Sequence, residues 1–232
     1  MKRLVVILAL VVVGYADAAP VVVLPRPSFP APATGPGAGA NTVHFQIVSS
    51  APIDPAQPIP SPKPLGGARI EGPDGNTQHI VVTLGEPFDF KNFAWPPRIA
   101  PGERPYGYEQ VVYANRSAAG TLFVETAHQT YAKSSYGLNG YLNAVGPRQR
   151  QLLWRSPAQV ANARNFVILN HTVITGYGFT AEPDYLYALD AFTGKVEGRL
   201  LLPSAPQVIA RHGNELTVTT YDHRVAVRVT GA

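Results

Sequence analysis

YLYALDAFTGKVEGR, from Tyr185 to Arg199, begins with a short apolar stretch, passes through a turn and starts a returning segment. It predicts a strand at Tyr185–Leu189 and a turn built on Asp190, Thr193 and Gly194. A weaker copy, YLNAVGPRQRQLLWR, runs from Tyr141 to Arg155. Four positions correspond: Tyr141 with Tyr185, Leu142 with Leu186, Ala144 with Ala188, and Arg155 with Arg199. A period of about 44 residues in a strand-rich chain indicates a β-unit used more than once.

From Glu109 onward the pattern predicts successive units of this kind. Similar dipeptides open them, at Gln110-Val111, Gln159-Val160 and Gln207-Val208. Second strands are predicted at Thr121–Ala127, Asn165–Leu169 and Glu215–Thr219, and Thr172–Tyr177 would lengthen the middle one after a break. Third strands are predicted at Tyr141–Val145, Tyr185–Leu189 and Arg224–Val229. Closing strands are predicted at Leu152–Arg155 and Val196–Leu202, and the chain ends before a third one. No window has helical periodicity, so we predict an all-β, partial β-propeller-like array of about three four-stranded antiparallel units.

Residues 67–108 precede these units and are less regular. Ala68–Glu71 and His79–Leu84 flank the turn sequence Gly72–Asn76, which predicts a hairpin. The following stretch, Phe88–Tyr108, is dense in aromatic residues and prolines. We expect it to be an irregular segment whose aromatic rings fill a core, because buried aromatic side chains remove so much apolar area from water.

The pattern Ala188-x-Asp190-x-x-Thr193-Gly194-Lys195 resembles the blade signature of pyrroloquinoline-quinone-type (PQQ-like) β-propeller repeats. The tryptophan that usually ends this signature is Gly198 here, whereas the preceding unit keeps Trp154 and lacks the turn residues. The resemblance covers about residues 109–232 and implies a blade architecture. In such a signature the aspartate and threonine satisfy backbone groups of the turn, the glycine supplies a positive φ, and the tryptophan packs between sheets.

The resemblance implies much less about activity. Quinoprotein dehydrogenases of this family use a complete ring of blades, a central calcium site of acidic and amide ligands, and often a vicinal cysteine pair. This chain has no cysteine, and no carboxylate cluster in it can be assigned to calcium. Closed propellers have about four to eight blades, so a three-unit array must stay open with capped edges, bend into a smaller form, or complete a ring with other copies of itself.

The N-terminus has the layout of a secretory signal peptide. Lys2 and Arg3 precede an apolar run at Leu4–Val13, and Ala16–Ala18 forms a small-x-small cleavage site. We predict a signal peptide at residues 1–18; an uncleaved anchor is the alternative, although the run is shorter than the roughly 20 residues that span a bilayer. The chain is then expected to be periplasmic or extracellular, and its lack of cysteine fits a bacterial exported protein.

Residues 19–66 are predicted to be a disordered Pro/Ala/Gly-rich linker, because they hold more than half of the 23 prolines and few charges. The linker would be either a spacer or a disordered leader. One island inside it, Thr42–Ser49, alternates well enough to dock as an edge strand. The β-repeat domain is predicted at residues 67–232. The formal net charge of +4 is small and dispersed, which argues against nucleic-acid binding.

Known catalytic motifs are absent from the sequence. It has no G-x-S-x-G nucleophile elbow, no H-E-x-x-H and no Gly-rich phosphate loop, and its six histidines lack metal-ligand spacing. Glu125 with His128, and Asp222 with His223, are the nearest acid–base neighbours. Adjacent strand residues point to opposite faces, so Asp222 and His223 converge only if they lie in a turn, and we interpret them as the polar tip of a hairpin. No catalytic, cofactor-binding or metal-binding residue is therefore predicted.

A binding rim is the one constellation that the repeat suggests. The loops between second and third strands, Gln129–Gly140, Gly178–Asp184 and Tyr221–His223, should emerge at the same end of the domain. The residues predicted to share that rim are Tyr131, Tyr136, Tyr177, Phe179, Tyr221 and His223. Ordinary packing of tyrosine-rich loops is the alternative.

Together these features favour a secreted, non-enzymatic β-repeat module that binds a protein, peptide or glycan, or acts as a scaffold, in the bacterial envelope. The alternative is a degenerate or accessory PQQ-dependent quinoprotein domain. The predicted module needs no cofactor, and a homo-oligomer is one way to complete its ring.

Overall fold

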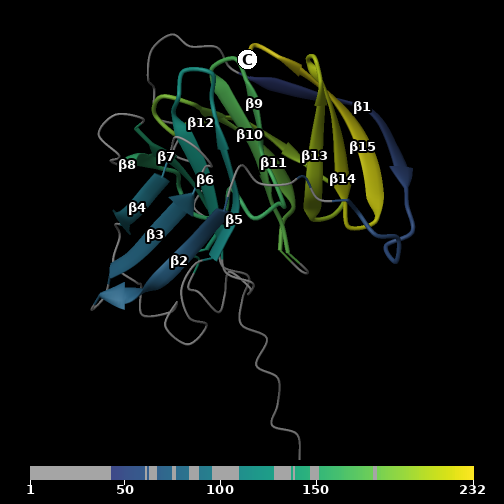
Figure 1. The fold of residues 1–232 in the computed structure, drawn as a ribbon. Helices are drawn as coiled ribbons and strands as arrows, with labels where there is room; N and C mark the ends of the chain where they lie inside the picture. Colours follow the sequence, from purple (N-terminus) through teal and green to yellow (C-terminus); the bar gives the residue numbers. More distant parts are fainter. Residues whose placement is uncertain are drawn as a thin grey trace, which may run out of the picture. The chain divides into compact units, whose positions relative to one another are not determined.

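The structure is a computed structural model, and it describes residues 43–60, 62, 67–74, 77–83, 89–95, 110–127, 137, 139–146, 152–179 and 182–232. All of them belong to one compact unit within residues 34–232. Every regular element in these ranges is a β-strand (Figure 1), as the sequence predicts.

Three sheets have four antiparallel strands each. The first contains β5 (Gln110–Arg116), β6 (Leu122–Ala127), β7 (Tyr141–Val145) and β8 (Leu152–Arg155). The second contains β9 (Val167–Leu169), β10 (Thr172–Tyr177), β11 (Tyr185–Asp190) and β12 (Val196–Leu201). The third contains β13 (Pro206–His212), β14 (Glu215–Thr220), β15 (His223–Thr230) and β1 (His44–Pro52). The predicted array of four-stranded units is therefore confirmed.

A further sheet is formed by the strands between β1 and β5 in the chain. It pairs β2 (Gly67–Asp74) with β3 (Thr77–Thr83), which is the predicted hairpin, and β3 with β4 (Asp89–Trp95). The expectation of an irregular segment at Phe88–Tyr108 is wrong for β4, because this part of the aromatic stretch continues the sheet. The rest of that stretch lies outside the described residues.

The third sheet is completed from the other end of the sequence. β1 pairs antiparallel with β15 from His44↔Thr230 to Pro52↔His223, with a β-bulge between Ile47 and Ser49. Figure 1 shows β1 alongside β15, although the two strands lie near opposite ends of the chain. The docking expected for Thr42–Ser49 is thus observed from His44 and continues to Pro52. The unit that the sequence leaves without a closing strand receives β1, from within the span predicted as linker.

In the second sheet the predicted third and closing strands are confirmed as β11 and β12, but the predicted start of the sheet is wrong. Gln159-Val160 does not open a strand: Gln159 has a positive φ of 63°, and Val160 is buried in an irregular segment. The first strand is β9, which pairs with β10, so Thr172–Tyr177 is a separate strand rather than an extension of β9. Asn170, at the turn between them, also has a positive φ of 52°.

The signature turn after β11 is held together as the sequence predicts. Asp190 Oδ1 accepts hydrogen bonds from the main-chain N–H groups of Phe192 and Thr193 at 3.0 and 2.7 Å. Gly194 has a φ of 71°, in the left-handed region that favours glycine. Trp154 packs against Gly194, where a Cβ would overlap the indole ring, and its Nε1–H donates to the Ala191 carbonyl at 3.1 Å. The tryptophan of the first sheet is therefore anchored on the turn of the second.

Gly198 occupies the position in the second sheet that Trp154 occupies in the first. Each pairs with the equivalent alanine, Ala188 for Gly198 and Ala144 for Trp154. A Cβ at Gly198 would overlap the main chain of Val43, the buried residue just before β1. A tryptophan therefore does not fit at position 198, because the Val43 backbone, just before β1, fills the space that its side chain would need.

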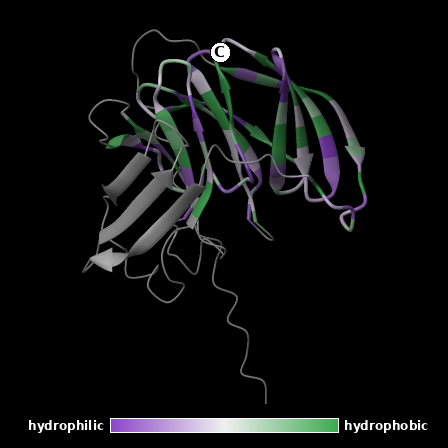
Figure 2. Ribbon diagram, in the orientation of Figure 1, coloured by the Kyte–Doolittle hydropathy of each residue, from purple (hydrophilic) through white to green (hydrophobic). Residues whose placement is uncertain are grey.

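Two apolar clusters lie between the sheets. One joins the first and second sheets around Phe123, Trp154 and Phe166, and the other joins the second and third around Leu186 and Val227. Apolar and polar residues alternate along β14 and β15 (Figure 2), with the apolar ones buried. β6, β7 and β10 are buried along their whole length.

The repeat seen in the sequence also appears as a repeated contact. Arg155 lies over the ring of Tyr141 with its Cζ 3.5 Å from the ring centroid, and Arg199 lies over Tyr185 at 5.2 Å. These are cation–π pairs, each joining the third strand of a sheet to its fourth.

Substitution of Gly198 tests how β1 is held. In Gly198→Ala the added Cβ meets the Val43 backbone, which must move. We therefore expect the free energy of unfolding to fall by about 1–3 kcal/mol. Hydrogen exchange of amides in residues 44–52 should accelerate more than exchange in β10 and β11. Gly213→Ala is the matched control, because nothing lies within 4 Å of its Cβ and only its left-handed backbone resists the change. Equal acceleration of β1 in both variants would contradict this account.

Candidate functional site

Only part of the predicted rim can be located. Tyr131 and Tyr136 lie outside the described residues, as does most of the Gln129–Gly140 loop. Tyr177 is 2% exposed and packs beside Gly140, where a Cβ would approach its ring. Its hydroxyl donates to Glu182 Oε2 at 2.7 Å, and burial raises its pKa. Tyr177 is thus a core residue and unavailable to a partner.

The other two predicted loops do lie at one end of the domain. The Leu202 N–H donates to the Asp184 carbonyl at 2.8 Å, and the Tyr221 N–H donates to the Ala205 carbonyl at 2.9 Å. The segment between β12 and β13 therefore ties the Gly178–Asp184 loop to the β14–β15 turn. Phe179 is partly buried at this rim.

Asp222 and His223 form the polar tip of the β14–β15 hairpin, as predicted. His223 Nδ1 lies 2.6 Å from Asp222 Oδ1, which also accepts a hydrogen bond from the Ser204 hydroxyl. These two contacts, with Ser204 first, lower the pKa of Asp222. The carboxylate stands between the serine and the histidine, so His223 does not contact the Ser204 hydroxyl as a general base would. The cluster holds the turn rather than activating a nucleophile.

Asp184 is the electrostatically strained group of the rim. Desolvation, followed by the charges of Glu182 and Asp222, raises its pKa from 3.8 to about 6, while a hydrogen bond from the Phe179 backbone acts in the opposite direction. Its Oδ1 is buried and without a hydrogen-bond partner. The rim therefore carries a group of carboxylates that repel one another.

Among the rim residues that the structure describes, Tyr221 is the exposed aromatic one, with 57% of its surface accessible. It borders a hollow of about 410 Å³. The other lining residues come from the segment after β1 and from the starts of the second and third sheets: Pro55, Gln57, Pro58, Ile59, Arg164 and Gln207. The sequence predicted Tyr221 but missed the rest, because β1 brings its following segment here from far away in the chain.

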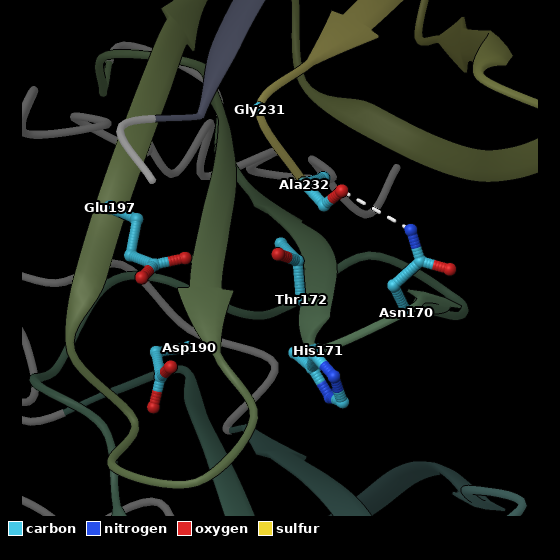
Figure 3. Close-up of a pocket in the computed structure, with 7 residues that line it drawn as sticks. All are labelled: Asn170, His171, Thr172, Asp190, Glu197, Gly231 and Ala232. Carbon is cyan, nitrogen blue, oxygen red and sulfur yellow. Dashed lines mark hydrogen bonds between the residues drawn. The ribbon is translucent and has the colours of Figure 1, made fainter. Parts of the chain in front are cut away.

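A second hollow, of about 380 Å³, lies at the opposite end of β10 (Figure 3). Its lining residues come from the β9–β10 turn, β10, β11, β12 and the residues after β15: Asn170, His171, Thr172, Asp190, Glu197, Gly231 and Ala232. The Asn170 side-chain amide donates to the Ala232 carbonyl at 3.2 Å. Sequence reasoning assigned Asp190 to the turn alone and missed this hollow.

Glu125 is a fully buried carboxyl group among the described residues. It is 0% exposed, its Oε2 accepts from the Thr175 hydroxyl at 3.3 Å, and its Oε1 has no partner. Desolvation raises its pKa well above the ordinary value. A carboxyl so enclosed between the first and second sheets cannot meet a ligand from solvent.

Among the described residues, no group of three or more His, Cys, Asp or Glu side chains is arranged to hold a metal ion. The same residues contain no helix with the length and apolar character needed to cross a membrane.

Comparison with known proteins gives matches to solved structures alone. No protein-family profile and no curated protein sequence matches the chain. BamB from Moraxella catarrhalis is similar at 12% identity and a TM-score of 0.35, over 69% of this chain and 54% of BamB. The quinohemoprotein alcohol dehydrogenase ADHIIG from Pseudomonas putida HK5 is similar at 13% identity and a TM-score of 0.41, over 75% of this chain and 30% of the enzyme.

A europium-containing methanol dehydrogenase is similar at 14% identity and a TM-score of 0.36, over 70% of this chain and 28% of the enzyme. The chain thus spans about half of BamB and less than a third of each dehydrogenase. These are PQQ-like β-propeller repeat proteins, the class that the Asp190–Gly194 signature resembles. At such identities and TM-scores the matches say nothing about what this chain does.

Stability should depend on pH through Asp184. Because its folded pKa is about 6 and its ordinary value 3.8, the folded state binds the extra proton, and stability is lost as the pH rises through this window. Asp184→Asn removes that loss and can still accept the Phe179 N–H. In urea unfolding, the free energy of unfolding of the variant should increase relative to that of the wild type from about pH 4 to about pH 6. Above about pH 6 the difference between the two proteins should stay constant. A difference independent of pH would show that Asp184 titrates normally.

Proposed function

We propose that this chain is an exported, non-enzymatic β-propeller-type module that binds a protein partner through the hollow beside Tyr221. The observation that carries the proposal is the exposure of Tyr221, a large aromatic side chain held at a tight hairpin on a rigid sheet. Aromatic residues are enriched where proteins meet, since they bring a large apolar area and a hydrogen-bonding group at low entropic cost.

The lining of the hollow supports a peptide segment as its occupant. Pro55, Pro58 and Ile59 offer apolar contact, and Gln57 and Gln207 offer amide groups that can pair with a peptide backbone. Such a mixture of apolar surface and a few polar groups is typical of binding hollows on proteins.

The walls of the hollow are fixed by hydrogen bonds. The Arg164 N–H donates to the Gln207 carbonyl at 2.7 Å, and Arg164 Nη1 donates to the Ile59 carbonyl at 3.2 Å. The Ile53 N–H donates to the Asp222 carbonyl at 2.8 Å, which continues the β1 pairing to the rim. A preformed surface loses little conformational entropy on binding, which favours affinity.

Export is the second part of the proposal. It is supported by the basic start, apolar run and small-x-small site of residues 1–18, and by the absence of cysteine. We place the partner in the bacterial envelope or outside the cell, and we assign residues 19–66 the role of a linker that also supplies β1.

Photo-crosslinking tests this function. A photoreactive phenylalanine analogue in place of Tyr221, in the full chain expressed in its native cells, should give one discrete adduct with a protein. The same analogue in place of Leu153 is the matched control, because Leu153 is also exposed and lies in β8, away from the residues that line this hollow. The expected result is an adduct at position 221 that position 153 does not give. Identical adducts from both positions, or no protein adduct at 221, would contradict the proposal; the latter result would redirect attention to a glycan.

The alternative, an accessory quinoprotein domain, is separated by a direct titration. Addition of pyrroloquinoline quinone with Ca²⁺ to the full chain, followed by gel filtration, should leave no quinone absorbance with the protein. Retained absorbance together with dehydrogenase activity would favour the alternative over a binding module.

A further inference from the structure

The hollow in Figure 3 has an excess of negative charge among its lining residues. Asp190 and Glu197 both line it, and the described lining residues include neither lysine nor arginine. Burial and the nearby charge of Asp190 raise the pKa of Glu197, which shows that the two carboxylates act on each other. Within the described part of the chain, Glu197 makes no hydrogen bond or ion pair. Glu197 is a partly buried carboxylate beside another one, and no lysine or arginine among the described lining residues offsets the two charges.

Asp190 and Glu197 differ in what they can offer a ligand. Asp190 Oδ1 already accepts from the Phe192 and Thr193 N–H groups and from the Thr193 hydroxyl at 2.7 Å, so the turn occupies it. Glu197 has no such task. Lys195, in the same turn, is exposed and is not among the lining residues.

Thr172 gives an independent indication of a ligand. It is 2% exposed, yet its hydroxyl hydrogen-bonds no other group of the described residues. Its side chain lies in the hollow on the side of Glu197 (Figure 3). The hydroxyl is not one of the fully enclosed unpaired oxygens of the described residues, which fits an oxygen that faces the hollow. This hydroxyl is therefore available as an acceptor inside the hollow.

An aromatic pair stands at the edge of the hollow. The ring of Phe192, a residue that is 67% exposed, lies beside that of His171 with centroids 5.1 Å apart and the ring planes tilted by 39°. His171 lines the hollow, and Phe192 belongs to the same turn as Asp190. The face of a phenylalanine ring attracts cations through its quadrupole, so Phe192 suits the ligand that the carboxylates suit.

We propose that this hollow binds an organic cation, through a primary ammonium or guanidinium group placed against Glu197 and the Thr172 hydroxyl. The ligand class follows from the available groups: carboxylate and hydroxyl acceptors satisfy the several N–H donors of such a cation. A volume of about 380 Å³ accommodates an alkyl chain as well as its charged end, and it is far larger than a metal ion requires. The site is separate from the Tyr221 hollow and does not depend on the function proposed for it.

Isothermal titration of the full chain with agmatine and with putrescine, at constant ionic strength, tests the proposal. Saturable one-site binding is expected. Glu197→Gln should weaken it about tenfold or more, because a charge-assisted hydrogen bond is lost, and Thr172→Val should weaken it several-fold (about three to ten). Glu215→Gln is the matched control, since Glu215 is an exposed glutamate that pairs with Arg228 at 3.0 Å elsewhere on the surface; it should leave binding unchanged. Circular dichroism verifies that each variant is folded.

A peptide with blocked ends and one central arginine distinguishes the sources of the cation. Binding at least as tight as that of agmatine would assign the site to a basic side chain of a protein, and binding of the free amines alone would assign it to a small molecule; both support the proposal. It would be overturned by the absence of saturable binding below about 10 mM, by an equal loss in Glu215→Gln and Glu197→Gln, or by binding of CaCl₂ without binding of either amine. Loss of this binding in a variant that still crosslinks through position 221 would show that the two sites are independent.

Discussion

The pairing of β1 with β15 is the constraint on which the rest of the described structure depends. It supplies the fourth strand of the third sheet. Without it, β15 would be an edge strand with unpaired backbone N–H and C=O groups. An open edge of this kind is a template for pairing with other chains. The pairing also determines an otherwise puzzling departure from the repeat: Gly198 replaces the signature tryptophan because the Val43 backbone occupies its place. The residue at position 198, in the second sheet, is thus restricted by Val43, a residue far away in the sequence.

Both hollows lie at ends of this strand pair. At one end, Pro52 pairs with His223, and the chain continues into Pro55–Ile59, which line the Tyr221 hollow. At the other end, His44 pairs with Thr230, and the next residues of β15's chain, Gly231 and Ala232, line the acidic hollow. Each hollow therefore combines a turn of the repeated sheets with a segment positioned by β1. Their chemistry differs: one offers Tyr221, prolines and amides, and the other offers uncompensated carboxylates.

The sequence predicts what is local and misses what is not. The turn at Asp190 and Gly194, the strands of the first and third sheets and the exposure of Tyr221 follow from short patterns with a physical cause. The start of the second sheet was misplaced because Gln159-Val160 resembles a strand opening, although Gln159 takes a left-handed backbone and Val160 is buried without a ladder. Tyr177 is predicted at the rim because it adjoins a loop between a second and a third strand, yet its hydroxyl pairs with Glu182 and its ring is enclosed.

The acidic hollow could have been suspected from one signal in the sequence. Asp190 and Glu197 stand on either side of the signature turn, and only Asp190 is needed for the turn itself. An acidic residue with no local role, at the start of a returning strand, is costly next to another carboxylate unless a cation compensates it. What the sequence could not reveal is the third wall, because Ala232 reaches Asn170 only through the β15 pairing. A repeat thus provides the scaffold, while the segments that depart from the repeat make its two ends chemically distinct.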